Sequence, residues 1–293
     1  MPSNETSRDL EGQVVIITGA GKGIGRAAAL QLARNGARVL VNNRRAPGQE
    51  EHASSAAQVV AQIRREGGQA AASFDDATDR ASGARMVQQA LDLWGRLDMV
   101  YANAAIAQGS TFENTALDDL LAIIDAGVVG TASLLHAAWP VMRQQRYGRA
   151  LVSTSSAGRF GGIGLSAYGA SKGAIEALMR SLALEGARHG IRCNAISPYA
   201  TSQMTRAHLP ADLASQLEPD CLGPVVAWLL SPRCEVTGQV VVAGGGRMAR
   251  AWTVETRPVA SEVPDTAWAT LQTQEGLPHA DAGQAFAGFM RGG

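Results

Sequence analysis

Three side chains near the middle of the chain could together move a proton to or from an oxygen atom. Tyr168 and Lys172 stand four residues apart in the run Ser-Ala-Tyr-Gly-Ala-Ser-Lys, and Ser155 lies thirteen positions before the tyrosine. Residues four apart on a helix share one face, so the lysine charge should lower the tyrosine pKa from its ordinary value of about 10. The spacing predicts Tyr168 as acid/base, with Ser155 holding a substrate carbonyl or alcohol. Alone, the pair also fits an ordinary surface helix.

A glycine-rich segment near the N-terminus favours the chemical interpretation. It directly follows the apolar run Val14-Val15-Ile16-Ile17 and precedes an apolar helical pattern. Glycines at such a turn let the backbone approach a pyrophosphate, which then rests on the N-terminus of the next helix. A glycine-rich surface turn is the alternative. We expect a dinucleotide cofactor on this segment, bound by Thr18, Gly19, Gly21, Lys22, Gly23, Ile24 and Gly25.

The end of the second predicted strand should decide between the two nicotinamide dinucleotides. An acidic residue there binds the ribose 2′-hydroxyl of NAD, whereas a basic residue accommodates the 2′-phosphate of NADP. Here the position is Asn43, followed by Arg44 and Arg45, and Lys22 stands in the glycine segment. We therefore expect NADP, with NAD as the alternative. The competing interpretation is that the two arginines are a solvated loop pair.

Strands alternate with helices along most of the chain. This order predicts a single α/β domain of the Rossmann type, a doubly wound parallel sheet of about seven strands with helices on both faces. Residues 1–246 should form this domain, and residues 247–293, which have little periodicity, a C-terminal extension packed on it. The predicted strands are 14–17, 38–42, 70–74, 98–102, 150–153, 191–196 and 239–242. The predicted helices are 27–35, 49–66, 81–93, 117–144 and one that bears Tyr168 and Lys172 and runs to about residue 189.

Composition excludes several classes of protein. The 293 residues carry 26 basic and 26 acidic side chains, which gives no support for nucleic-acid binding or a polybasic membrane anchor. The sequence has no run of 18 uninterrupted apolar residues and no signal-peptide pattern at its N-terminus. Three scattered cysteines and five histidines form no disulfide framework or metal-ligand spacing. We expect a cytoplasmic protein without a metal.

Taken together, these motifs resemble the short-chain dehydrogenase/reductase family over residues 10–246. The likeness adds an aspartate after the third strand, an Asn-Ala pair after the fourth and a proline loop after the sixth. It implies that Tyr168 is the acid/base, that Lys172 binds the nicotinamide ribose and lowers the tyrosine pKa, and that Ser155 orients the substrate oxygen. It further implies cofactor contacts from Asp75, Asp76, Asn103, Ala104, Ala105, Pro198 and Thr201.

A narrower likeness concerns the (3R)-hydroxyacyl-CoA dehydrogenase unit of peroxisomal multifunctional β-oxidation enzymes. It rests on the polar helix after Arg45, on Ala137-Ala138-Trp139 and on Ala200 to Thr205. Three positions depart from the family pattern. Gly127 stands where an asparagine usually supports a proton relay, Ala105 replaces a glycine and adds a methyl group, and Tyr199 replaces the glycine after the proline.

The resemblance implies an oxidoreductase that transfers a hydride between NADP(H) and a secondary alcohol or ketone. A 3-hydroxyacyl or 3-oxoacyl thioester is one candidate substrate, by analogy. A nucleotide-binding pseudoenzyme that senses or scaffolds is the alternative, and Gly127 is the residue that favours it. The variable loops carry few charges, so we expect an apolar or amphipathic substrate. The two long helices should form the family's homodimer or homotetramer surface. The loops are 105–113, 159–166 and 201–217, with Phe112, Phe160, Ile163, Leu165, Met204 and Leu209.

Overall fold

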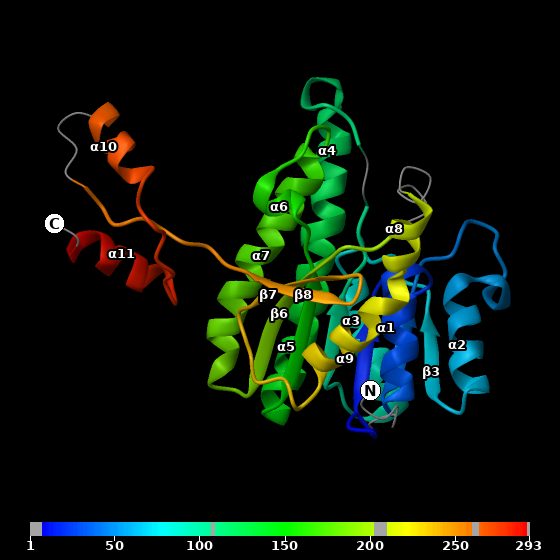
Figure 1. Ribbon diagram of the computed structural model, residues 1–293. Coiled ribbons are helices and arrows are strands. Elements are labelled where there is room, and N and C mark those ends of the chain that lie inside the picture. Colours follow the sequence, from blue (N-terminus) through cyan, green and yellow to red (C-terminus); the bar gives the residue numbers. More distant parts are fainter. Residues whose placement is uncertain (1–7, 107–108, 202–209, 260–263, 292–293) are drawn as a thin grey trace. The chain divides into compact units, whose positions relative to one another are not determined.

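An eight-stranded sheet forms the centre of the protein, which a computed structural model describes over residues 8–106, 109–201, 210–259 and 264–291. The strand order is β3-β2-β1-β4-β5-β6-β7-β8 (Figure 1). The chain divides into two compact units, Met1–Ala249 and Arg250–Gly293. The α/β fold with a doubly wound, mostly parallel sheet is therefore confirmed, and the first unit contains the predicted site.

The central strands are short apolar runs whose residues are buried on both faces of the sheet. In β1 and β4 every residue is buried, which is typical of parallel strands covered by helices on both sides. All pairings from β3 through to β7 are parallel. The strands are β1 (Val14–Ile17), β2 (Arg38–Asn42), β3 (Gln69–Ser73), β4 (Met99–Ala102), β5 (Gly148–Ser153), β6 (Ile191–Pro198), β7 (Val240–Gly244) and β8 (Arg247–Ala251).

The eighth strand was not predicted. It follows β7 across Gly245 and Gly246, whose φ angles are +56° and +72°, a conformation that glycine adopts without strain. Four of its five residues are exposed, so it lacks the apolar pattern that reveals a buried strand. The second compact unit begins within this strand, three residues after the predicted boundary at residue 247.

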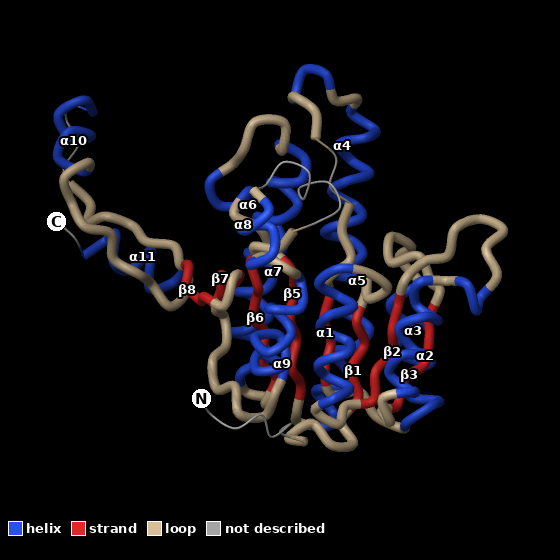
Figure 2. The backbone as a smooth tube through the Cα atoms, turned by 45° about the vertical axis from the view of Figure 1, so that its right-hand side comes forward, coloured by secondary structure: helices blue, strands red, loops and turns tan. Residues whose placement is uncertain are grey.

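Helices cover both faces of the sheet (Figure 2). On one face α1 contacts α2 and α9, and on the other α3 contacts α5, while α4 contacts α7. The predicted helix 117–144 is interrupted by a π-helical turn at Asp125–Val129. The helices of this unit are α1 (Gly23–Arg34), α2 (Ser55–Arg65), α3 (Ser82–Trp94), α4 (Leu117–Ile124), α5 (Gly130–Gln145), α6 (Ala157–Phe160), α7 (Ser166–Ala187), α8 (Ala211–Gln216) and α9 (Gly223–Leu230), with short 3₁₀ turns at Glu51–Ala53, Phe112–Asn114 and Pro219–Leu222.

One helical stretch, Leu117–Gln145, is long and apolar enough to cross a membrane by length and composition. In the folded chain it packs against α3, α7 and the strands β4 and β5. Its side chains Leu134, Leu135 and Met142 are buried there. The buried part of this stretch, 39% of its apolar window, therefore covers the sheet.

Over its described residues, 250–259 and 264–291, the second unit contains two helices and one isolated bridge between extended segments. The bridge joins Glu255 and Leu277 through backbone hydrogen bonds of 2.9 and 2.7 Å. The helices are α10 (Pro264–Leu271) and α11 (Ala282–Arg291). That this extension packs on the first unit stays a prediction.

Candidate active site

The glycine segment between β1 and α1 is tied to the end of β4. The Thr18 hydroxyl accepts hydrogen bonds from the backbone N–H groups of Asn103 (3.0 Å) and Ala104 (3.1 Å). In return, the Asn103 side-chain amide donates to the Thr18 carbonyl at 3.1 Å. The Asn103 amide oxygen accepts a hydrogen bond from Ser153 at 3.1 Å. Thr18 and Asn103 therefore hold the glycine segment in register with β4 and β5.

Two glycines of this segment have no room for a side chain. Gly19 has a φ angle of +64°, and a Cβ atom there would lie 3.1 Å from the Ala104 Cα atom. A Cβ atom on Gly25 would collide with the Gly19 carbonyl oxygen. The backbone can follow this path only with glycine at both positions.

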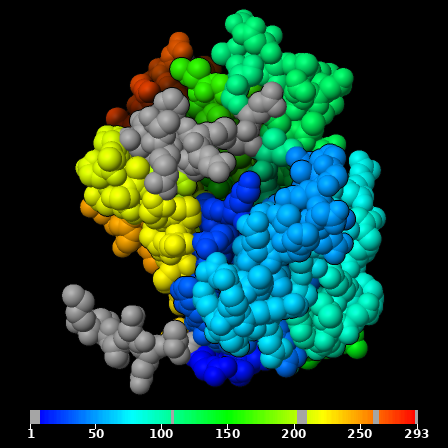
Figure 3. Space-filling model, turned by 90° about the vertical axis from the view of Figure 1, so that its right-hand side faces the viewer, coloured from blue at the N-terminus to red at the C-terminus, as the bar shows by residue number. Residues whose placement is uncertain are grey.

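The first turn of α1 is open to an anion. The helix begins at Gly23, and the preceding residue, Lys22, makes no side-chain cap. The N–H groups at such a helix start carry partial positive charge and suit a pyrophosphate. In the space-filling view, the blue N-terminal segment lies recessed between the light-blue segment that includes α2 and the yellow segment with α8 and α9 (Figure 3). The residues present fit the dinucleotide that the sequence predicts.

A cavity of about 300 Å³ continues from the glycine segment along the carboxyl ends of β2, β3 and β4. Seven of the predicted cofactor residues line it: Gly19, Asn43, Arg44, Asp76, Asn103, Ala104 and Ala105. Asn42, Ala77, Thr78, Ile106 and Ala126 complete the lining. Polar side chains at one end and small residues along the wall suit an adenosine group.

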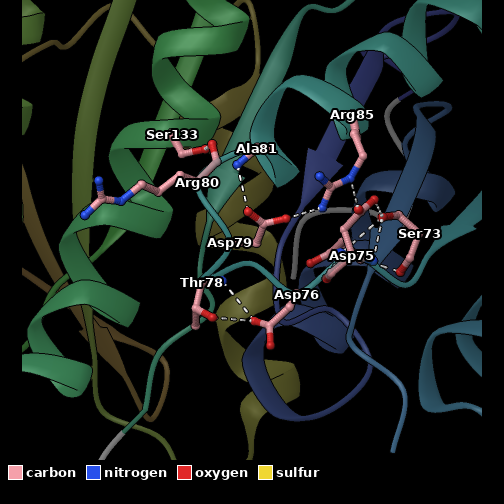
Figure 4. Close-up of polar contacts among 10 residues, drawn as sticks. Ser73, Asp75, Asp76, Thr78, Asp79, Arg80, Ala81, Arg85 and Ser133 are labelled. Carbon is pink, nitrogen blue, oxygen red and sulfur yellow. Dashed lines mark hydrogen bonds and ion pairs between the residues drawn. The ribbon is translucent and has the colours of Figure 1, made fainter. Parts of the chain in front are cut away.

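Two neighbouring aspartates after β3 have different surroundings (Figure 4). Asp75 is bound by Arg85 Nε at 2.5 Å and by the Ser73 hydroxyl at 3.1 Å, and Arg85 also pairs with Asp79. Asp76 accepts hydrogen bonds from the Thr78 N–H and hydroxyl groups. Of the two, only Asp76 lines the cavity. The Asp75 carboxylate is paired with Arg85, and its contact with the cofactor, which the resemblance implies, stays a prediction.

Arg44 does not stand alone at the ribose end of the cavity. Its Nη1 atom lies 3.3 Å from the Asp76 carboxylate. Burial opposes ionisation of Asp76, but the hydrogen bonds from Thr78 and the Arg44 charge hold its pKa below the ordinary value. The sequence argument for NADP found no carboxylate here, because Asp76 comes from a different strand. The Asn43 side chain donates to Ser55 at 3.0 Å.

The predicted catalytic residues come from the end of β5 and the start of α7. Ser155 follows β5, and its hydroxyl accepts a hydrogen bond from the Ala157 N–H group at 3.2 Å. Lys172 is buried, with 2% of its surface exposed, and its Nζ atom lies 5.5 Å from the centre of the Tyr168 ring. Nζ donates to the Ser153 carbonyl at 2.8 Å, a partner that the sequence did not suggest.

The pKa values of this group differ from the sequence expectation in one respect. Burial raises the pKa of Tyr168, and a hydrogen bond with Ser155 lowers it, so that the net direction is upward. The predicted lowering by Lys172 is therefore not seen in the protein alone. Burial lowers the pKa of Lys172 to about 8, which leaves the ammonium charged at neutral pH.

The remaining predicted residues lie after β6. Pro198 ends the strand, and the buried Thr201 donates to the Leu217 carbonyl from both its hydroxyl (3.1 Å) and its backbone N–H group (2.7 Å). The predicted substrate residues Met204 and Leu209 lie outside the described residues. On the loops that are described, Phe160 and Ile163 are 82% and 97% exposed. That these exposed apolar side chains contact the substrate stays a prediction.

Gly127 lies in the π-helical turn, where the chain passes close to α7. A Cβ atom at this position would lie 3.0 Å from both the Cβ and Oγ atoms of Ser171. The Ser171 hydroxyl is buried and donates to the Tyr168 carbonyl at 2.8 Å. Glycine therefore gives the turn room to pass beside the residue that precedes Lys172.

Gly127→Asn should lower both stability and kcat. Without a shift of Ser171 the new side chain does not fit, and overpacking of this kind costs about 1–3 kcal/mol. Thermal denaturation and steady-state kinetics measure the two effects. Ser171→Gly in the same chain should restore part of each. A Gly127→Asn variant that is equally stable and faster would instead support an incomplete proton relay in the wild type.

Comparison with known proteins identifies similar sequences over most of the chain. The family described as short chain dehydrogenase matches residues 13–213. A short-chain type dehydrogenase/reductase of Mycobacterium tuberculosis is 39% identical over 243 residues, 82% of this chain and 85% of that protein. The peroxisomal multifunctional enzyme type 2 of Mus musculus is 40% identical over 238 residues. That match covers 80% of this chain but only 32% of the mouse enzyme.

A solved structure with bound ligands shares the fold. It is a 7α-hydroxysteroid dehydrogenase in complex with NADH and 7-oxo glycochenodeoxycholic acid. The two chains are 27% identical and superpose with a TM-score of 0.74, over 83% of this chain and 97% of the other. In that enzyme the same fold binds NADH and a steroid ketone.

Proposed function

Because the chain belongs to the short-chain dehydrogenase family and is an NAD(P)-dependent oxidoreductase acting on CH–OH groups, we propose that it interconverts an apolar secondary alcohol and its ketone with NADP(H). The observation that carries the proposal is the buried Lys172 ammonium beside the Tyr168 ring, with the Ser155 hydroxyl near enough to the phenol to lower its pKa. The first candidate substrate is a 3-hydroxyacyl or 3-oxoacyl thioester, supported by the resemblance to multifunctional enzymes.

The chemistry divides between cofactor and protein. The nicotinamide supplies or accepts the hydride when it is bound. Tyr168 donates a proton to the carbonyl oxygen in reduction and removes it from the alcohol in oxidation. Ser155 orients that oxygen, and the Lys172 charge favours the phenolate form. The Ser153 carbonyl accepts the Lys172 hydrogen bond and so holds the ammonium beside the Tyr168 ring.

An assay with NADPH and a set of ketones tests the function. The set comprises 3-oxoacyl thioesters of several chain lengths, steroid ketones and small polar ketones, with absorbance at the nicotinamide band as readout. We expect kcat/KM to rise with the apolar area of the substrate. Preference for polar ketones would refute the substrate class, and bound cofactor with no turnover would support the sensing or scaffolding alternative.

The preference for NADP rests on Arg44. A charge-assisted hydrogen bond to the 2′-phosphate contributes about 1.5–3 kcal/mol, which is tenfold or more in affinity. Arg44→Ala should therefore weaken NADPH binding about tenfold or more, because the Asp76 carboxylate would then face the 2′-phosphate without the Arg44 charge between them. NADH lacks this phosphate, so its binding should stay within about twofold. Fluorescence titration with both cofactors measures this.

Arg45→Ala is the matched control for this change. The Arg45 guanidinium lies 5.0 Å from the centre of the Phe74 ring and 3.8 Å from Glu51, and it does not line the cavity. It should leave the affinity for both cofactors unchanged. Equal losses for NADPH and NADH in Arg44→Ala, or a wild type that prefers NADH, would refute the assignment.

We also propose a cytoplasmic homodimer or homotetramer. The helices α4 and α7 expose apolar side chains that a partner subunit would cover, among them Leu117, Leu121 and Leu184. Light scattering after size-exclusion chromatography measures the mass in solution. A monomer at micromolar concentration would contradict this part of the proposal.

A further inference from the structure

A buried ion pair lies behind the catalytic residues and takes no part in the chemistry described so far. Glu176 is on α7, one turn after Lys172, and only 3% of its surface is exposed. Arg159, on the short helix α6, donates from Nη1 to Glu176 Oε1 at 2.5 Å. The Arg159 side chain is 13% exposed. Charges this far removed from water are costly unless they are paired and hydrogen-bonded, so the pair must be held by several partners.

Two further hydrogen-bond partners of Arg159 and Glu176 lie at the carboxyl ends of β5 and β6. The second guanidinium nitrogen of Arg159 donates to the Ser197 hydroxyl at 2.9 Å. Ser197 is buried in β6, immediately before Pro198. Glu176 Oε1 also accepts a hydrogen bond from the Thr154 hydroxyl at 2.8 Å. Thr154 directly precedes Ser155. The ion pair thus joins the neighbours of Ser155 and of Pro198 to the helix that carries Tyr168 and Lys172.

Close packing of α6 on α7 leaves this pair little freedom to move. A Cβ atom on Gly158 would lie 2.7 Å from the Gly173 nitrogen and 2.8 Å from the Lys172 carbonyl carbon. The two backbones therefore touch beside Lys172. Since Ser155 accepts a hydrogen bond from Ala157 in the same short helix, a shift of α6 would move the serine hydroxyl.

We propose that Arg159 and Glu176 are positioning residues, which hold Ser155 and the Pro198 segment in register with Tyr168 and Lys172. The inference deepens the proposed function and rests on it for the reaction that is measured. Arg159 spans two elements because its planar guanidinium has nitrogens for both a carboxylate and a hydroxyl. The pair acts only through Ser155 and the segment after β6.

The test removes both charges together. Loss of one partner would leave the other charge buried and could unfold the protein, whereas replacement of both by apolar groups of similar volume is often tolerated. The double variant Arg159→Met/Glu176→Met should therefore fold, melt within a few degrees of the wild type and bind NADPH within about twofold. Its kcat should fall about tenfold or more, as expected for a misplaced reacting group.

Two further variants separate positioning from charge. Arg180→Gln is the matched control, since Arg180 bonds the outer oxygen of the same carboxylate at 3.1 Å and is 39% exposed. It should change kcat less than twofold, as surface pairs contribute little. Arg159→Lys keeps the positive charge but replaces the guanidinium, whose two nitrogens bond Glu176 and Ser197, by a single ammonium group. The kcat of Arg159→Lys should lie between that of the wild type and that of the double variant.

A readout without substrate distinguishes failure of this inference from failure of the proposed function. Phenolate absorbance, taken as the difference from Tyr168→Phe, follows the titration of Tyr168 beside Ser155 and Lys172. The apparent pKa should rise in the double variant, because the Ser155 hydrogen bond that lowers it would weaken. If the apparent pKa of Tyr168 rises in the double variant while the wild type turns over none of the ketones, the proposed function is refuted and the positioning role is supported. An unchanged titration, or a kcat within twofold of wild type, overturns the inference.

Discussion

Replacement of Tyr168 by phenylalanine should lower kcat by about 10²- to 10⁴-fold, the usual contribution of a general acid/base group. The ring would stay in place between α7 and the end of β5, so its packing is kept and only the hydroxyl is lost. NADPH affinity and the melting temperature should change little, because the phenol makes no hydrogen bond in the protein except that with Ser155 among the described residues.

A second tyrosine provides the control for this change. Tyr147 is also partly buried, and its hydroxyl lies 3.4 Å from the Gln13 side chain. It immediately precedes β5, at the amino end of the strand, whereas Ser155 follows the carboxyl end. Tyr147→Phe should leave kcat within twofold. If Tyr168→Phe turns over at a comparable rate, another group supplies the proton and this residue is not the acid/base.

The fold could be predicted because its information is local. Runs such as Val14–Ile17 and Met99–Ala102 are apolar without interruption, and glycine or polar residues end them. The strand that was missed, β8, is exposed along most of its length and is defined by its pairing beside β7. The π-helical turn was missed because the apolar pattern continues through Asp125–Val129, and Gly127, a poor helix former, was considered only for its missing side chain.

The candidate site was predictable where residues are close in sequence. Tyr168 and Lys172 share a helix face, and the glycine segment directly joins a strand to a helix. What the sequence does not contain is the pairing between distant segments. Asp76 reaches Arg44 across 32 residues, and Arg159 reaches Ser197 across 38. Such contacts depend on the order of strands in the sheet, so neither the altered electrostatics at Arg44 nor the buried ion pair was foreseen.

Lys172→Met should alter how stability depends on pH. Burial lowers the pKa of Lys172 to about 8 in the folded chain, while in the unfolded chain a lysine titrates near 10.4. Between these values the unfolded state binds more protons than the folded state, so the wild type gains stability as the pH rises. The methionine variant has no such group. The wild type should therefore gain about 2–3 kcal/mol relative to it from pH 7 to pH 10.

Urea denaturation of both proteins at several pH values measures this difference, and the subtraction removes groups that titrate equally in both. Lys172→Arg is a useful companion, because its guanidinium stays charged throughout and should give no recovery at high pH. A constant difference between wild type and Lys172→Met from pH 7 to pH 10 would mean that the ammonium is stabilised where it lies. The Ser153 carbonyl, at 2.8 Å from Nζ, would then compensate for the loss of water, and Lys172 would keep its charge well above pH 8.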